Sequence, residues 1–351
     1  MEEKKLYQVT SSPHIRSKDT TRGIMTDVVI ALLPALAVAV YVFGLRAIVM
    51  TVVAAASCVF FEWLYRKLMK KSDSVADTSA VVTGVLLAYC MPVSAPYWMA
   101  VVGAFFAIVI VKQLYGGLGK NFMNPALAAR AFLFSWPVIM TTWIAPAQYN
   151  AAGTLNNIFL ADAETAATPL SYLHSGIIPT EQFTVLNLFV GTIGGSFGEV
   201  SALALLLGGV YLIYRKVISA HIPLSFIGVM VIVTFLFPRG GDRLMWMLYN
   251  VLSGGVMLGA IFMATDYVTS PMTKKGQVIF GAGCGLITLF IRYFGSYVEG
   301  VSYAILIMNN CTWLIDKATL PRRFGVSKEE LAAAKAKAKE DKKKAKEGAT
   351  A

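Results

Sequence analysis

One polar stretch between apolar segments carries the residues best suited to covalent chemistry. It spans residues 162–170 and reads DAETAATPL. The hydroxyl of Thr168 can form an ester with a phosphate group if it lies on an exposed, extended segment. Pro169 favours that conformation, because proline disfavours helical backbone at the preceding residue. Taken alone, a Thr-Pro pair in a loop is more often ordinary turn structure. Thr168 is a candidate attachment point for a phosphate-bearing cofactor, with Thr165 as its nearest competitor.

A second group of candidates consists of polar residues inside or beside apolar runs. A charge at the middle of a bilayer costs about 3 kcal/mol or more, so such groups face a cavity or a partner. Asn121 and Asn124 precede Pro125, and either they cap a helix that begins there or they line a polar cavity. For the ionisable residues, an ion path and paired structural charges at span ends both remain open; they are Asp27, Glu62, Arg130, Glu199, Asp266 and Glu299. The pair Asp266 and Glu299 is the stronger candidate for an ion path, whereas structural pairing is favoured for Glu62.

The composition is that of a polytopic membrane protein. Of the 351 residues, 56% are hydrophobic and only 15% are charged, against about 25% charged residues in soluble domains. The net charge of +11 would suggest nucleic acid in a soluble protein, but here the basic residues lie in links and tails. The four cysteines lie in apolar runs without metal-ligand spacing and are expected to be small buried side chains. No metal site and no complete catalytic site is predicted.

Ten apolar runs approach the roughly 20 residues that a helix needs to cross a bilayer. The sixth is too long for one span, and its four glycines predict a broken start. The predicted runs are 23–43, 47–64, 78–91, 98–111, 125–140, 185–214, 222–237, 245–264, 278–294 and 301–315. We therefore predict an all-α fold of about ten transmembrane helices.

The distribution of basic residues predicts the orientation. With the N-terminus in the cytoplasm, all but five of the 31 Lys and Arg residues fall on the cytoplasmic side. Cytoplasmic links are enriched in basic residues in this way. Both termini are therefore expected inside. The stretch from Thr141 to Val185, which has no Lys or Arg, is expected outside.

A weak internal repeat has an offset of about 175 residues. Residues 84–96 resemble residues 259–271, and residues 119–132 occupy the place of residues 295–308. Each half then holds five spans, and an odd number inverts the second half relative to the first. The predicted segments are a cytoplasmic N-terminus (1–22), a first repeat (23–140), an extracytoplasmic loop (141–184), a second repeat (185–316) and a basic cytoplasmic tail (317–351).

Several motifs together resemble those of the RnfD/NqrB family. Residues 162–168 resemble the flavin-attachment motif Asp-x-x-Ser/Thr-Gly-Ala-Ser/Thr, with Asp162, Thr165, Ala167 and Thr168 matching and Ala166 where glycine is usual. The runs GKNFMNPALAARAF (119–132) and FMATDYVTSP (262–271) look like family signatures. Residues 22–34 and 295–309 also match, so the resemblance covers nearly the whole chain. The length favours the RnfD branch.

The resemblance implies a function and a fold. RnfD-like subunits belong to a cell-membrane complex that couples electron transfer between ferredoxin and NAD to Na⁺ or H⁺ translocation. The family carries FMN joined by its phosphate to the last threonine of the motif, here Thr168, and its fold is a urea-transporter-like bundle of two inverted five-helix repeats. A non-covalent riboflavin near the cytoplasmic side is also implied, and the region Arg22–Asp27 is a candidate for it.

The expected partners are the other subunits of the complex, a flavin transferase for maturation, and lipid; no nucleic acid is expected. NAD and ferredoxin are expected to meet other subunits. The competing hypothesis is a small-solute channel or permease of the same inverted-repeat fold.

Overall fold

The computed structural model describes residues 19–72, 74–144 and 167–321, and within them the chain is helical with no β-strand. Asp162, Thr165 and Ala166 lie outside the described residues. The prediction of an all-α membrane protein is confirmed at this level, because three helices are long and apolar enough to cross a bilayer, or four if a bent pair counts as one span.

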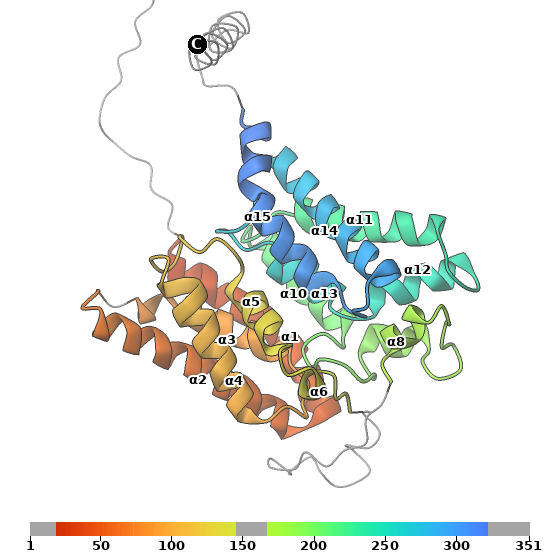
Figure 1. Ribbon diagram of the computed structural model, residues 1–351, viewed down its shortest axis with the longest axis horizontal. Helices are drawn as coiled ribbons and strands as arrows, with labels where there is room; N and C mark the ends of the chain where they lie inside the picture. Colours follow the sequence, from red (N-terminus) through yellow and green to blue (C-terminus); the bar gives the residue numbers. More distant parts are fainter. Residues whose placement is uncertain (1–18, 73, 145–166, 322–351) are drawn as a thin grey trace, which may run out of the picture.

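Two groups of helices lie side by side (Figure 1). The first group consists of α1 (Thr21–Phe43), α2 (Leu45–Leu68), η1 (Val75–Asp77), α3 (Ser79–Tyr89), α4 (Tyr97–Phe105), the π-helix η2 (Phe106–Gln113), α5 (Pro125–Leu133) and α6 (Pro137–Met140). The second consists of α10 (Ala202–Tyr214), α11 (His221–Leu236), α12 (Arg243–Leu252), α13 (Val256–Leu258), the π-helix η4 (Gly259–Met263), α14 (Lys274–Phe294) and α15 (Val301–Thr319). Between them in the sequence lie two short helices, α8 (Pro169–His174) and α9 (Val185–Val190).

Each predicted apolar run coincides with helical structure, but three runs are interrupted. The expected break at the start of the sixth run is confirmed: α9 ends at Gly191, whose φ is +108°, and α10 begins at Ala202. The fifth run, expected to be continuous from 125 to 140, ends α5 at Leu133 and resumes as α6 at Pro137. The eighth run, also expected to be continuous, bends by 62° between α12 and the helical segment Val256–Met263.

The two groups meet along α1 and α10 and along α5 and α15. At the α1–α10 crossing a side chain on Gly208 would place its Cβ 2.1 Å from the carbonyl oxygen of Ala31. Only glycine allows two helix backbones to approach so closely, a common feature of helix pairs in membranes. The crossing therefore fixes the spacing between the groups.

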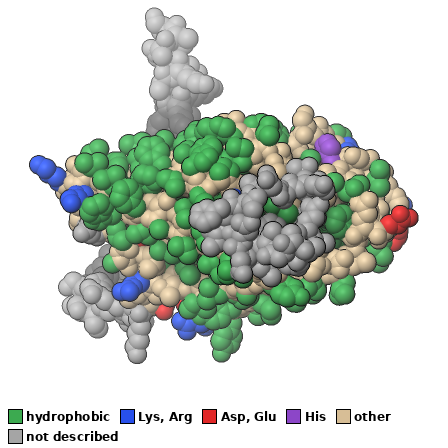
Figure 2. Space-filling view, turned by 90° about the horizontal axis from the view of Figure 1, so that it is seen from below, with side chains coloured by type: hydrophobic (Ala, Val, Ile, Leu, Met, Phe, Trp, Pro, Cys, Tyr) green, Lys and Arg blue, Asp and Glu red, His purple; other side chains and the backbone are tan. Residues whose placement is uncertain are grey.

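The outer surface is apolar. Seen from the side of α6 and α8, hydrophobic side chains cover much of the rim of the molecule and charged ones are few (Figure 2). Large hydrophobic residues are strongly exposed on several helices, among them Tyr41, Leu207, Leu224, Phe290 and Trp313. So much exposed apolar surface suits lipid rather than water.

Candidate functional site

Thr168 lies directly before α8, with its backbone extended at φ −81° and ψ 154°. This is the conformation predicted from Pro169. The Thr168 Oγ1 accepts a hydrogen bond from the backbone N–H of Ser171 at 3.3 Å, so Thr168 is the N-cap of the short helix. Its side chain is half-buried rather than fully exposed, whereas Ala167 is exposed.

Thr168 and Ala167 stand on the wall of a cavity of about 590 Å³. This volume lies within the range of roughly 300–1,000 Å³ typical of cofactor and ligand pockets. The walls come from the end of α5, the start of α8, the broken segment before α10, the α12–α13 bend and the turn before α15. The other lining residues are Arg130, Phe134, Thr141, Trp143, Pro169, Leu170, Ser171, Ile193, Gly194, Gly195, Ser196, Glu199, Val200, Gly254, Ser296, Tyr297, Val298 and Glu299.

Two ion pairs lie at the polar side of this cavity. Arg130 Nη1 donates to Glu199 Oε1 at 2.8 Å, and both side chains are almost fully buried. Arg292 Nη2 lies 3.4 Å from Glu299 Oε1, and the backbone N–H of Gly255 donates to the other oxygen of Glu299 at 3.0 Å. A buried carboxylate needs such partners because burial of an unpaired charge is very costly.

At the α12–α13 bend, the backbone of Gly254 lies directly against the Arg292–Glu299 ion pair. Gly254 has φ +71°, and a Cβ there would lie 2.4 Å from Glu299 Oε2 and 2.9 Å from Arg292 Nη2. Glycine is therefore needed both for the left-handed backbone and for the space that the ion pair occupies.

One nitrogen of the Arg130 side chain has no hydrogen-bond partner. Its Nε is buried and makes no hydrogen bond, although buried polar groups are normally paired. Two aromatic side chains, Phe134 and Tyr297, line the same cavity in an edge-to-face arrangement with ring centroids 6.4 Å apart. Charged side chains, aromatic walls and a hydroxyl at the rim would fit a planar, hydrogen-bonding cofactor attached through Thr168.

The predicted polar residues divide between two cavities at opposite ends of α5. Glu299 lines the larger one, whereas Asn121, Asn124 and Asp266 line a second cavity of about 90 Å³. Asn124 performs both of the roles left open, because its Oδ1 caps α5 through the N–H groups of Ala126 and Leu127 while the residue also lines the cavity. Burial raises the pKa of the Asp266 carboxyl, which lies in the loop after η4.

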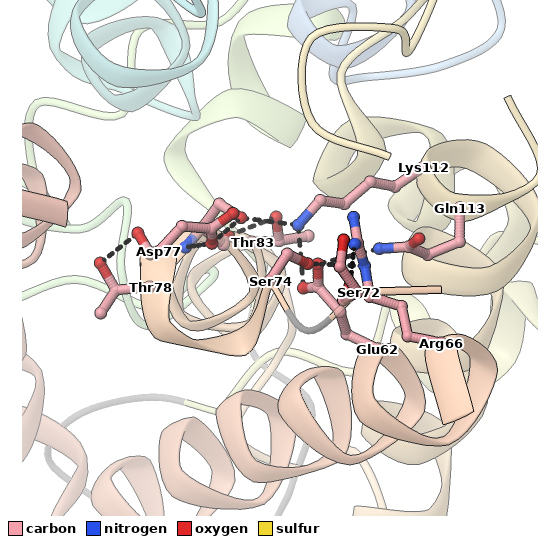
Figure 3. Close-up of polar contacts among 10 residues, drawn as sticks. Glu62, Arg66, Ser72, Ser74, Asp77, Thr78, Thr83, Lys112 and Gln113 are labelled. Carbon is pink, nitrogen blue, oxygen red and sulfur yellow. Dashed lines mark hydrogen bonds and ion pairs between the residues drawn. The ribbon is translucent and has the colours of Figure 1, made fainter. Parts of the chain in front are cut away.

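Glu62 belongs to a separate buried cluster at the end of α2 (Figure 3). Its carboxylate is fully buried and accepts hydrogen bonds from Lys112 at 2.9 Å, Gln113 at 2.8 Å and Ser74 at 2.7 Å. Arg66, one helical turn further along α2, lies 4.0 Å away. The favoured interpretation of Glu62 as a paired charge agrees with this geometry.

Asp27, in the region proposed from the resemblance for a second flavin, is tied to the end of α10. It accepts hydrogen bonds from Tyr211 at 2.9 Å and from Arg215 at 3.1 Å.

Sequence reasoning missed several residues of the Glu62 cluster and of the ion pairs beside the 590 Å³ cavity. Lys112 and Arg292 were counted only as topological charges, and Gln113 and Ser196 were not singled out. The signal available for Arg292 was its spacing of seven residues from Glu299. Lys112 and Glu62 are 50 residues apart in sequence, so no local pattern links them.

Comparison with known proteins decides the family. The model of the NQR2, RnfD, RnfE family matches residues 8–325. This chain belongs to that family. The described part of the cavity wall and both ion pairs fall inside the matched region, so the site is part of the family fold rather than an added segment.

Three relatives show how similar the members are along their whole length. The D subunit of the Na⁺-translocating ferredoxin:NAD⁺ oxidoreductase complex of Acetobacterium woodii is 53% identical over 91% of this chain and 96% of its own. The D subunit of the proton-translocating ferredoxin:NAD⁺ oxidoreductase complex of Clostridium ljungdahlii is 42% identical over 92% of this chain and 97% of its own. The D subunit of an ion-translocating oxidoreductase complex of Aliivibrio salmonicida is 36% identical over 92% and 99%.

Proposed function

We propose that this chain is the flavin-carrying membrane subunit of a complex that couples electron transfer between ferredoxin and NAD to Na⁺ or H⁺ translocation. The assignment to such a complex is supported by 53% and 42% identity to the D subunits of two ion-translocating ferredoxin:NAD⁺ oxidoreductases. The other subunits would bind ferredoxin and NAD, and a flavin transferase would modify this chain.

The observation that carries the flavin proposal is the position of Thr168 on the wall of the 590 Å³ cavity. FMN would be joined through its phosphate to the Thr168 Oγ1, and its ring would lie between Phe134 and Tyr297 and the polar side formed by Arg130, Glu199 and Glu299. Bound there, FMN would supply one- and two-electron chemistry; the chain binds the ring, orients it and surrounds it with fixed charges.

The proposed architecture is two inverted five-helix repeats, as in a urea-transporter-like bundle. One half is α1, α2, α3, α4 with η2, and α5; the other is α10, α11, α12 to η4, α14, and α15. Support comes from the two cavities, which use equivalent positions of the two halves. Four pairs of lining residues are separated by the same 175 positions: Met25 and Val200, Ser79 and Gly254, Asn121 and Ser296, and Asn124 and Glu299.

The second cavity does not fit a riboflavin in this structure. Its volume of about 90 Å³ is far below the roughly 300 Å³ at which ligand pockets begin. It suits a few water molecules, and no step through a second flavin is derived.

The test of the flavin proposal is the intact mass of the purified subunit after co-expression with a flavin transferase. We expect an added mass of one FMN, lost in Thr168→Ala and kept in Thr168→Ser, because the attachment needs only a hydroxyl. Thr165→Ala is the matched control and should keep the added mass.

Two results would count against this assignment. If Thr165→Ala loses the mass and Thr168→Ala keeps it, the attachment residue is wrong. If no variant and no wild-type protein carries flavin, and liposomes containing the subunit take up a small solute, the channel hypothesis replaces it.

A further inference from the structure

We propose that the outward face of α15 is a docking surface for a transmembrane helix of another membrane subunit, which forms a hydrogen bond with the side-chain amide of Asn310. The identity of the partner rests on the proposed place of this chain in a multisubunit complex. The polar character of the face rests on the residues of this chain alone. Neither the sequence motifs nor the names of the relatives assign a contact surface.

The helix α15 buries one side and leaves the opposite side open. It packs mainly against α14, α5 and η4, and its buried residues are Val301, Ser302, Ala304, Ile305, Met308 and Asn309. Successive residues of an α-helix are about 100° apart around the axis, so residues 303, 307, 310, 314 and 317 lie on the opposite side. Figure 1 shows α15 at the front of the molecule, where no other described helix covers it.

The open side has the spacing of a helix–helix seam. Its residues, separated by steps of four, three, four and three, are Tyr303, Ile307, Asn310, Leu314 and Lys317. Helices that pack along one another in a left-handed coiled coil meet at this spacing. The side chain of Ile307 is 48% exposed and that of Leu314 is 55% exposed, and Asn310 and Lys317 are also exposed. The geometry is therefore that of a contact with a second helix.

Asn310 lies at the depth of the bilayer centre. It stands midway along α15, two residues beyond Met308, which is about 3 Å along the axis. A Cβ on Gly283 would lie 2.5 Å from the Cε of Met308, so Met308 is level with the middle of α14. That helix, Lys274–Phe294, is one of the three that are long and apolar enough to cross a membrane. Lipid at this depth offers no hydrogen-bonding group.

The Asn310 amide is only half satisfied within its own chain. Its Nδ2 donates to the carbonyl oxygen of Leu306 at 2.9 Å, and its Oδ1 accepts no hydrogen bond from the described residues. An unpaired amide group in an apolar medium is costly, and asparagine in membrane helices bonds across to a neighbouring helix. The exposed stripe of α2 differs, because Val52, Ala56 and Phe60 are all apolar and suit lipid. The contrast indicates a protein partner for α15.

The charge at one end of the seam argues against a second copy of this chain as that partner. Two copies in one membrane have the same orientation, and a symmetric contact would place the same residue of each copy at the same level. Lys317 would then face Lys317, and such a juxtaposition of like charges is costly. A different helix, with a polar group at mid-depth and a carboxylate near Lys317, complements both positions.

The experiment is site-specific photocrosslinking in membranes of cells that make all subunits of the complex. A photoreactive amino acid is placed at position 307, 310 or 314. We expect each position to form an adduct with the same membrane subunit, identified by mass spectrometry. Position 56 is the matched control, because Ala56 is exposed at the middle of α2. It should form no adduct with that subunit.

The variant Asn310→Leu tests the hydrogen bond itself. It should lower the fraction of the crosslinked subunit that stays with this chain after detergent extraction by about threefold or more, as expected for an average interhelical hydrogen bond. Asn310→Gln keeps the amide and should retain more of the partner than Asn310→Leu. The purified Asn310→Leu subunit should melt no lower than the wild type, because within the chain the side chain bonds only to Leu306.

The outcomes separate this inference from the proposed function. If the chain co-purifies with the complex but positions 307, 310 and 314 form adducts only with lipid, or with a second copy of this chain, the docking surface is overturned. Full retention of the partner by Asn310→Leu also overturns it. A chain that co-purifies with no other subunit overturns the proposed function itself.

Discussion

At the scale of single residues, the predictable features are the local ones. The extended backbone of Thr168 and the cap formed by Asn124 both follow from a proline one position later, and the structure has both. The partners of Arg130 and Glu62 could not be predicted, because Glu199 and Lys112 are 69 and 50 residues away. Such pairs are decided by how helices pack, which no local pattern records.

The Glu62 cluster leads to a prediction about stability. Glu62→Gln removes the negative charge that holds the ammonium of Lys112, whose side chain is only 3% exposed. Loss of one partner of a buried ion pair costs about 3–5 kcal/mol. We expect a clear fall in the thermal unfolding midpoint of the detergent-purified protein.

Two variants make this result interpretable. Asp27→Asn weakens the pair with Arg215, whose side chain is 54% exposed, and should lower the midpoint less than Glu62→Gln does, because exposed pairs contribute little. The double variant Glu62→Gln/Lys112→Met removes both charges and should recover much of the loss. A Glu62→Gln protein that melts with the wild type would contradict the assigned role of the pair.

At the scale of helices, length and composition predicted where the apolar segments lie but not where they break. The glycines at 191, 194, 195 and 198 marked one break correctly. The end of α5 was missed because Phe134–Trp136 look ordinary within an apolar run. The end of α12 was missed although Gly254 and Gly255 carry the same glycine signal as the sixth run. At both places the break puts a cavity residue, Phe134 or Gly254, in position. The interruptions therefore belong to the site.

The α1–α10 crossing gives a prediction for helix packing. Gly208→Leu places a side chain against the Ala31 carbonyl, where even a Cβ would lie at 2.1 Å. Overpacking of this kind costs about 1–3 kcal/mol, occasionally more. Thermal unfolding in detergent should show the loss.

Gly228→Ala in α11 is the control for that substitution, because nothing lies within 4 Å of the added Cβ. It should gain about 0.5–1 kcal/mol, since alanine is favoured over glycine in a helix interior. Equal melting of the two variants would show that the close approach does not constrain the fold.

At the scale of the whole molecule, the proposed role requires that the free energy released by electron transfer drives an ion across the membrane. Moving one charge against a membrane potential costs about 2.3 kcal/mol per 100 mV, and a two-electron step releases about 1.4 kcal/mol for each 30 mV of potential drop. A drop of about 50 mV would therefore suffice to move one ion against 100 mV. A shift of a few tens of millivolts in the potential of the proposed flavin would therefore be comparable with the drop needed to move one ion.

Orientation is the whole-molecule property most directly open to test. We expect Thr180→Cys, exposed after α8, to react with a membrane-impermeant maleimide in intact cells, in a background without native cysteines. Lys70→Cys, exposed after α2, should react only after the cells are made permeable, because its basic link is predicted to be cytoplasmic. The reverse pattern would invert the topology and place Thr168, the proposed attachment residue, on the other face.

The walls of the 590 Å³ cavity come from segments that are synthesised at different times. Its walls include Arg130 from the first half of the sequence and Glu299 from the second. The cavity is therefore complete only when α14 and the turn before α15 are in place. Thr168 is synthesised well before that point, and it becomes half-buried only once α8 packs against those later segments. During synthesis the Thr168 hydroxyl is therefore present before the cavity is complete. Under the proposed flavin attachment, the order of synthesis would matter for maturation as well as recognition of the motif.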